Sequence, residues 1–239
     1  MIRGIAGDVT LYAITNCYWL EGTAESGIGG IMVGVLAVEL FANSADTIDK
    51  IDTDVAYSKY TSYEPYMTQT RNAVSMMKEY DPSLFYRMEA TFHRTVNDPI
   101  GTGYKGISHS SSTMNAPALM MLHKLGYAYG GHYTKYDGTT FMTDALFDIK
   151  YLMDKTGNTS FVGTRVKVPE EYKLTTEYTE GDATYKFYNN PNALGLGMVS
   201  SPSIEDVSLS EDNPFENQNM VFNALASTTK DYFTKIPVI

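Results

Sequence analysis

The residues best able to do chemistry are concentrated in one stretch, YRMEATFHRTVNDPIGTGYKGISHSSS, residues 86–112. It combines histidines, arginines, carboxylates, serines and glycines. Three kinds of site use these residue types: an activated serine nucleophile, a metal centre, and a glycine-rich phosphate loop. Each kind requires a particular spacing, which the sequence allows us to check.

A catalytic serine requires a base, an acid that orients the base, and an oxyanion hole. In α/β-hydrolases the serine also lies in a G-x-S-x-G turn, which the segment GISHSSST (106–113) lacks. The serines precede a predicted helix start at Asn115, where serines commonly form turns and caps. We therefore favour a structural role for them, with a soluble hydrolase that depends on His109 as an alternative.

The histidines do not follow the spacing of a known metal motif, since neither H-x-x-x-H nor H-E-x-x-H occurs. Cys17 is the only cysteine, which excludes an intramolecular disulfide and a cysteine-based metal site. The sequence therefore predicts no metal.

Gly101, Gly103 and Gly106 match the G-x-G-x-x-G spacing of dinucleotide-binding loops. The residues that follow are ISHSSS rather than the apolar face of a helix, so we expect no nucleotide and no other cofactor. Asp144 and Asp148 are spaced to share one helix face, and a solvated face or a helix N-terminus accounts for them.

Two interpretations of the stretch stay open. It is either a loop tied down by its own hydrogen bonds, through Asn97, Asp98 and Ser111, or a polar surface that contacts a ligand. The candidate surface consists of Arg87, Glu89, Asn97, Asp98, Tyr104, His109, Ser111 and Ser112.

The elements around this stretch predict an α/β (α+β) fold: a mixed sheet with flanking helices and a β-rich C-terminal part. Helices are expected over 64–82, with Met67, Thr70, Val74 and Met77 on one face, then over 115–126, from Thr143 or Asp144, and over 213–227. Strands are expected over 84–92, 150–153, 171–178, 183–189 and 193–200.

An apolar helix is predicted before this domain, at residues 26–43. The segment has no charge from Gly27 to Val38, which is short of the ~20 residues that cross a bilayer. Its glycines are common in membrane helices, so we predict a transmembrane helix with Glu39 near the headgroups; a buried core helix is the alternative. The chain thus divides into an uncertain segment 1–25, the helix 26–43 and the domain 44–239.

Net charge and amino-acid composition limit the classes of binding partner that we expect. The net charge of −10 argues against nucleic acid, whose phosphates require clustered lysine and arginine. Residues 43–64 are acidic, whereas cytoplasmic loops are usually basic, which places the domain outside the cytoplasm. The chain has 19 tyrosines against 10 phenylalanines, a pattern suited to sugar stacking or to half-buried strands.

Several motifs occur in the same order as in a known family. They are LAVELFANS, DPSLFYRME, NDPIGTGYKGISHSSSTMN, TDALFDIKYLMD, YKFYNNPNALGLGMVS and NPFENQN. Together they resemble the bacterial YfhO family of membrane proteins, over roughly residues 28–235.

The resemblance implies a polytopic protein of the GT-C glycosyltransferase type in the bacterial cell membrane. Such a protein transfers sugar from a polyprenyl-phosphate donor to a glycan polymer acceptor of the cell envelope, such as teichoic acid. Its catalytic acid lies in an early external loop that this chain lacks, so no catalytic residue is assigned. The chain then corresponds to an extracytoplasmic part that packs on the membrane bundle of its parent protein. A free-standing carbohydrate-binding or adhesion module is the alternative.

Overall fold

The computed structural model describes residues 6–10, 13–18, 26–54, 59–157 and 166–236. The chain forms two units, Met1–Lys59 and Tyr60–Ile239, which we call unit 1 and unit 2. Unit 1 contains an antiparallel hairpin of β1 (Ala6–Thr10) and β2 (Ala13–Tyr18), followed by helix α1 (Ser26–Asp54).

Helix α1 covers the predicted apolar helix 26–43 and continues beyond it to Asp54. Apolar side chains of α1 such as Val38, Leu40 and Phe41 are exposed, so the described residues of unit 1 do not bury them. The described residues hold no helix that is both long enough and apolar enough to cross a bilayer. The helix at 26–43 is therefore confirmed, whereas the membrane span predicted there is not.

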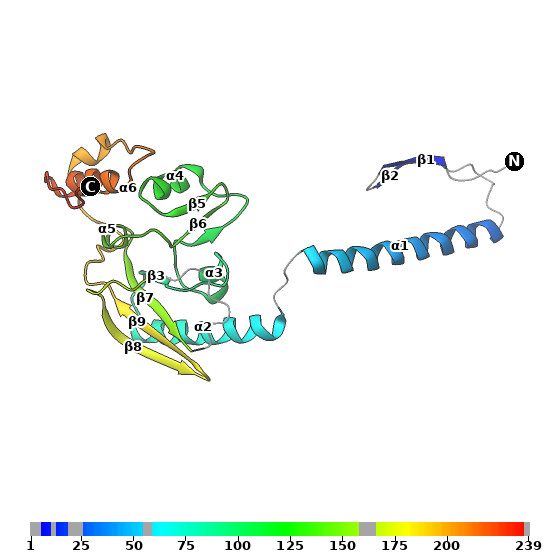
Figure 1. Ribbon diagram of the computed structural model, residues 1–239, viewed down its shortest axis with the longest axis horizontal. Helices are drawn as coiled ribbons and strands as arrows, with labels where there is room; N and C mark the ends of the chain where they lie inside the picture. Colours follow the sequence, from blue (N-terminus) through cyan, green and yellow to red (C-terminus); the bar gives the residue numbers. More distant parts are fainter. Residues whose placement is uncertain (1–5, 11–12, 19–25, 55–58, 158–165, 237–239) are drawn as a thin grey trace. The chain divides into compact units, whose positions relative to one another are not determined.

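Unit 2 is built on a mixed four-stranded sheet, which confirms the predicted fold class (Figure 1). Its strands are β3 (Arg87–Ala90), β7 (Ile149–Thr156), β9 (Ala183–Asn189) and β8 (Lys173–Glu180), in that order. Strand β3 pairs with β7 in parallel, and the other two pairs are antiparallel. Strand β3 covers only residues 87–90 of the strand predicted over 84–92.

Helix α2 (Tyr60–Tyr80) packs on one face of this sheet (Figure 1). The predicted face of Met67, Thr70, Val74 and Met77 is buried, as the helical spacing requires. Strand β9 supplies alternate residues to the same core, because successive side chains of a strand point to opposite faces. The helix begins at Tyr60, earlier than predicted, with Pro65 in its second turn.

A smaller antiparallel sheet completes the fold. It consists of β4 (His109–Ser110), β6 (Tyr133–Lys135) and β5 (Ala128–Gly130), with helix α4 (Ala116–Lys124) preceding β5. The Asn115 side chain accepts a hydrogen bond from the Ala118 N–H at 3.1 Å, which confirms the predicted helix cap.

A second core lies on the other side of β7. It contains Tyr127, Tyr136, Ile149, Leu152 and Tyr172. Since Tyr151 and Met153 belong to the core under α2, strand β7 is buried on both faces.

Two sequence predictions in the C-terminal half are wrong. Helix α5 (Phe141–Leu146) is capped by Thr140, and Thr143 instead completes a capping box at its third position. The predicted strand over 193–200 is a loop in which Gly195 has a φ of 80°. The predicted final helix over 213–227 is confirmed as α6 (Pro214–Ala226), which Asn213 caps and which follows a short 3-10 helix, η1 (Pro202–Asp206).

Candidate functional site

The polar stretch begins in β3, where the two charged residues have different surroundings. Arg87 Nη1 donates to the carbonyl of Phe147 at 2.7 Å. Glu89 is 1% exposed, and its carboxylate accepts hydrogen bonds from the backbone N–H groups of Ile107 and of Ser108, the latter at 2.9 Å. Burial raises the pKa of Glu89 to about 7 despite these bonds.

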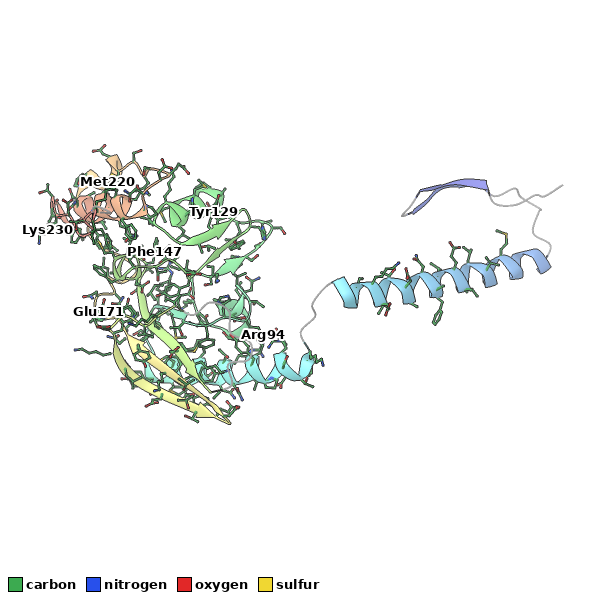
Figure 2. All side chains as sticks on the ribbon, viewed as in Figure 1. Arg94, Tyr129, Phe147, Glu171, Met220 and Lys230 are labelled. Carbon is green, nitrogen blue, oxygen red and sulfur yellow. The ribbon has the colours of Figure 1, made fainter. Side chains whose placement is uncertain are left out.

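Asp98, the first residue of the short helix α3 (Asp98–Thr102), is also buried and fully engaged. One carboxylate oxygen accepts from the Tyr66 hydroxyl and from the Arg94 N–H, both at 2.6 Å; Figure 2 labels Arg94. The other oxygen accepts from the Thr95 N–H at 3.0 Å and from its hydroxyl at 2.9 Å. Asp98 therefore joins α2 to the turn that precedes α3.

Further hydrogen bonds join residues within the polar stretch and at its end. The Asn97 side chain donates to the carbonyl of Ser110 and accepts from its N–H, at 3.1 and 2.8 Å. The Ser111 hydroxyl accepts from the Thr113 N–H at 3.2 Å. Ser112 is exposed.

In the part of the chain that the structure describes, no hydrogen bond joins His109 to a serine hydroxyl as in a hydrolase. His109 pairs with Thr134 in the small sheet, and its Nδ1 is buried without a hydrogen-bond partner among the described residues. The hydrogen bonds of Glu89, Asn97, Asp98 and Ser111 agree with the interpretation of a self-bonded loop. Ligand contact by the predicted surface stays a prediction.

One residue of the predicted surface, Tyr104, lines a cavity. The cleft has a volume of about 360 Å³ and lies between the end of α2, the start of β3 and residues 103–105. We call it the α2–β3 cleft. Its walls include Val74, Lys78, Leu84, Tyr86, Tyr104 and Lys105.

Two lysines give this cleft a positive edge. Lys78 Nζ donates to the carbonyl of Gly103 at 2.6 Å, and Lys105 Nζ donates to the carbonyl of Leu84 at 2.9 Å. An ammonium group has three N–H donors, so each lysine keeps donors for a ligand. Both side chains belong to exposed residues at the rim.

The carboxylate of the cleft, Asp81, is already neutralised. It accepts from Lys150 Nζ at 2.6 Å and from the Tyr151 hydroxyl at 2.9 Å. Burial alone would raise the pKa of Asp81, but the hydrogen bonds from Lys150 and Ser83 outweigh burial and hold the pKa below its usual range. The cleft therefore presents net positive charge beside aromatic and aliphatic walls.

Sequence reasoning missed Lys78, which lies outside the polar stretch, and Lys105, which lies within it but was not selected as a candidate. A usable signal was present for Lys78, a basic residue in the last turn of α2 in a chain of net charge −10. Only the packing of α2 against β3 shows that the two lysines share one cleft. Among the described residues, no group of three or more histidine, cysteine or acidic side chains could hold a metal ion.

Comparison with known proteins gives one match. The family described as bacterial membrane protein YfhO matches residues 18–238, which is most of the chain. No curated protein and no solved structure matches it. The chain therefore belongs to the YfhO family of bacterial membrane proteins.

Proposed function

We propose that this chain is an extracytoplasmic part of a membrane-bound glycosyltransferase of the GT-C type, and that unit 2 binds the glycan acceptor. Family membership supports a glycosyltransferase-like membrane protein. The observation that carries the acceptor role is the α2–β3 cleft, which combines Tyr86 and Tyr104 with the amines of Lys78 and Lys105.

The chemistry of the cleft suits a polymer of the cell envelope. Aromatic rings pack against the C–H faces of sugars, and ammonium groups donate hydrogen bonds to hydroxyls or to phosphodiester oxygens. Teichoic acids offer both groups. The volume of about 360 Å³ is sufficient for a short segment of such a polymer.

The chemical step is assigned to the rest of the parent protein. The carboxylates nearest the candidate surface, Glu89 and Asp98, are buried and hydrogen-bonded within the loop. The sugar would come from a polyprenyl-phosphate donor held by the membrane bundle. The exposed apolar side chains of α1 suit packing against that bundle.

Binding by the purified 239-residue chain tests the acceptor role. We expect teichoic-acid fragments to shift the NMR signals of residues around the cleft. Lys105→Ala should weaken this binding several-fold. Lys173→Ala, which removes an exposed lysine from β8, should not. Equal weakening of binding by the two substitutions would contradict the proposal. So would an unsubstituted chain that binds neither teichoic-acid fragments nor an uncharged glycan.

A second test uses the full-length parent protein in membranes, with a lipid-linked sugar as donor. We expect Tyr104→Ala and His109→Ala to lower transfer to the acceptor, because both belong to the predicted surface. The thermal unfolding of each variant is measured in parallel, since Tyr104 is buried. If each variant is expressed normally and sugar transfer is unchanged, these residues do not contact the acceptor. A free-standing carbohydrate-binding module predicts binding with no dependence of transfer on this domain.

A further inference from the structure

The loop Leu194–Val199, which we call the apolar loop, projects from unit 2 without cover. It is held at both ends, by the bond from the Leu194 N–H to the carbonyl of Ala145 at 3.1 Å and by a longer one, 3.5 Å, from the Ser201 N–H to the carbonyl of Leu225. Between these ends Leu196 is 65% exposed and Val199 is fully exposed. Four of its side chains are large, apolar and exposed: Leu194, Leu196, Met198 and Val199.

The sequence on either side of the apolar loop is also free of charged residues. No acidic or basic residue occurs between Lys186 and Glu205, although the chain as a whole has a net charge of −10. A cavity of about 410 Å³ lies beside the loop, and its lining includes Phe141, Pro191, Leu194, Phe222 and Tyr232. Every residue that lines this cavity is uncharged. An exposed apolar surface of this kind marks an interaction site.

We propose that the apolar loop inserts into the interfacial layer of a lipid bilayer, with Phe141 and Tyr232 beside it at the level of the headgroups. Aromatic side chains favour that level because their rings are apolar and, in tyrosine, the hydroxyl group is polar. The proposal is independent of sugar binding in the α2–β3 cleft, which involves other residues.

Two observations favour lipid over a protein partner. Protein interfaces carry about one hydrogen bond per 100–200 Å² and a polar rim, whereas residues 194–199 have only apolar side chains and glycines, and no charged residue lines the cavity. Gly195 and Gly197 have open space around them, so at these positions no described residue covers the loop. Fluid hydrocarbon can cover such a surface without polar matching. The chain also belongs to a membrane protein family, so a bilayer is its natural neighbour.

The charges next to the loop determine which lipids it prefers. Glu205, Asp206, Glu211 and Asp212 follow it in sequence, and they would be repelled by anionic headgroups. Insertion is therefore driven by apolar burial. On neutral lipid we expect insertion to be insensitive to salt, and we expect anionic lipid to weaken it.

Site-specific dye labelling tests the proposal on the whole chain. Cys17→Ser removes the only native cysteine, and Leu196→Cys or Val199→Cys then carries an environment-sensitive dye. Leu174→Cys is the matched control, because Leu174 is an exposed leucine (47%) on β8, away from the loop. With phosphatidylcholine vesicles we expect a blue shift, and quenching by brominated acyl chains, at positions 196 and 199 but not at 174.

The dye reports on the loop itself even if the apolar side chains of α1 hold the chain on the vesicle. Emission at 196 and 199 that stays as in water while the chain is vesicle-bound would overturn the proposal. A blue shift that grows with protein concentration without vesicles would also overturn it, since a second copy would then cover the loop.

A pair of charge substitutions provides a second measurement. Leu196→Glu with Val199→Glu should lower the vesicle partition coefficient by roughly tenfold or more, because two apolar side chains no longer leave water. Leu174→Glu should leave the partition coefficient unchanged. Equal partition of the double variant and the unsubstituted chain, together with unquenched dye at 196, would exclude insertion.

Discussion

The carboxylate of Glu89 on β3 accepts a hydrogen bond from the backbone N–H of Ser108 at 2.9 Å. This bond joins the large sheet to the residue directly before β4 of the small sheet, so a buried carboxyl group fixes the position of the polar loop. Gly106 makes the approach possible, since a Cβ at that position would lie 2.7 Å from Glu89 Oε1.

The first prediction concerns the stability contributed by Glu89. Its folded-state pKa of about 7 is above the ordinary value of 4.5, so the folded chain keeps this proton where the unfolded chain loses it. The free energy of unfolding should therefore fall as the pH rises from about 4.5 to 7, by about 3 kcal/mol from this group at most. Glu89→Gln should remove that fall, because the amide still accepts from Ser108 and carries no charge.

Chemical denaturation at a series of pH values measures this difference. Asp144 has a pKa raised to about 6 by burial and acts in the same direction, so the comparison is between variant and unsubstituted chain, not with a flat line. If the free energy of unfolding of Glu89→Gln and of the unsubstituted chain changes equally with pH, Glu89 does not have the raised pKa in the folded chain.

The second prediction concerns Asp98. Asp98→Ala removes the acceptor of the Tyr66 hydroxyl and of two backbone N–H groups, and it leaves Tyr66 buried without this partner. We expect a loss of about 3 kcal/mol in the free energy of unfolding. Asn97→Ala is the neighbouring control, because its two bonds to Ser110 lie at the surface, and it should cost about 1 kcal/mol. Equal losses in urea unfolding would show that Asp98 does not hold the loop.

The third prediction separates backbone strain from steric overlap. Gly157 and Gly195 both have a φ of 80°, a value that disfavours alanine. Around Gly195 there is open space, whereas a Cβ on Gly157 would overlap the carbonyl oxygen of Asp182. Gly195→Ala should therefore cost about 1 kcal/mol, and Gly157→Ala should cost more than about 3 kcal/mol. Thermal unfolding of the two variants would disprove this if the melting temperatures fell equally.

The fourth prediction concerns the attachment of α6. The buried Asn217 amide donates to the carbonyls of Lys124 and Ser210, at 2.6 and 2.9 Å, and accepts from the Ser210 N–H at 2.9 Å. Asn217→Ala should lower the free energy of unfolding by about 2–3 kcal/mol. Glu216→Ala, an exposed change in the same turn, should cost under about 1 kcal/mol. A small effect at Asn217 would mean that apolar packing alone attaches the helix.

Local signals in the sequence were sufficient for several elements. The helical face of Met67 and Val74, the cap at Asn115 and the helix start at Asn213 depend on neighbours within a turn or two, and the structure confirms them. The start of α5 was misassigned because Thr140 and Thr143 both satisfy a capping pattern. Their reciprocal bonds decide which residue is the cap.

Tertiary contacts determine what the sequence left open. The alternation in β3 placed Glu89 on a polar surface beside Arg87, but pairing with β7 and the return of residues 107–108 bury it. The alternating leucines at 194 and 196 indicated a strand, although no described strand pairs with them. Lys78 and Lys105 share a cleft only because α2 ends beside β3.

Because both hydrophobic cores share strand β7, unit 2 should unfold cooperatively. Tyr151 and Met153 pack under α2, while Ile149 and Leu152 belong to the opposite core, so neither hydrophobic cluster can come apart without exposing the strand they share. The cleft side and the apolar-loop side should consequently melt in one cooperative transition, and damage to either is transmitted to both.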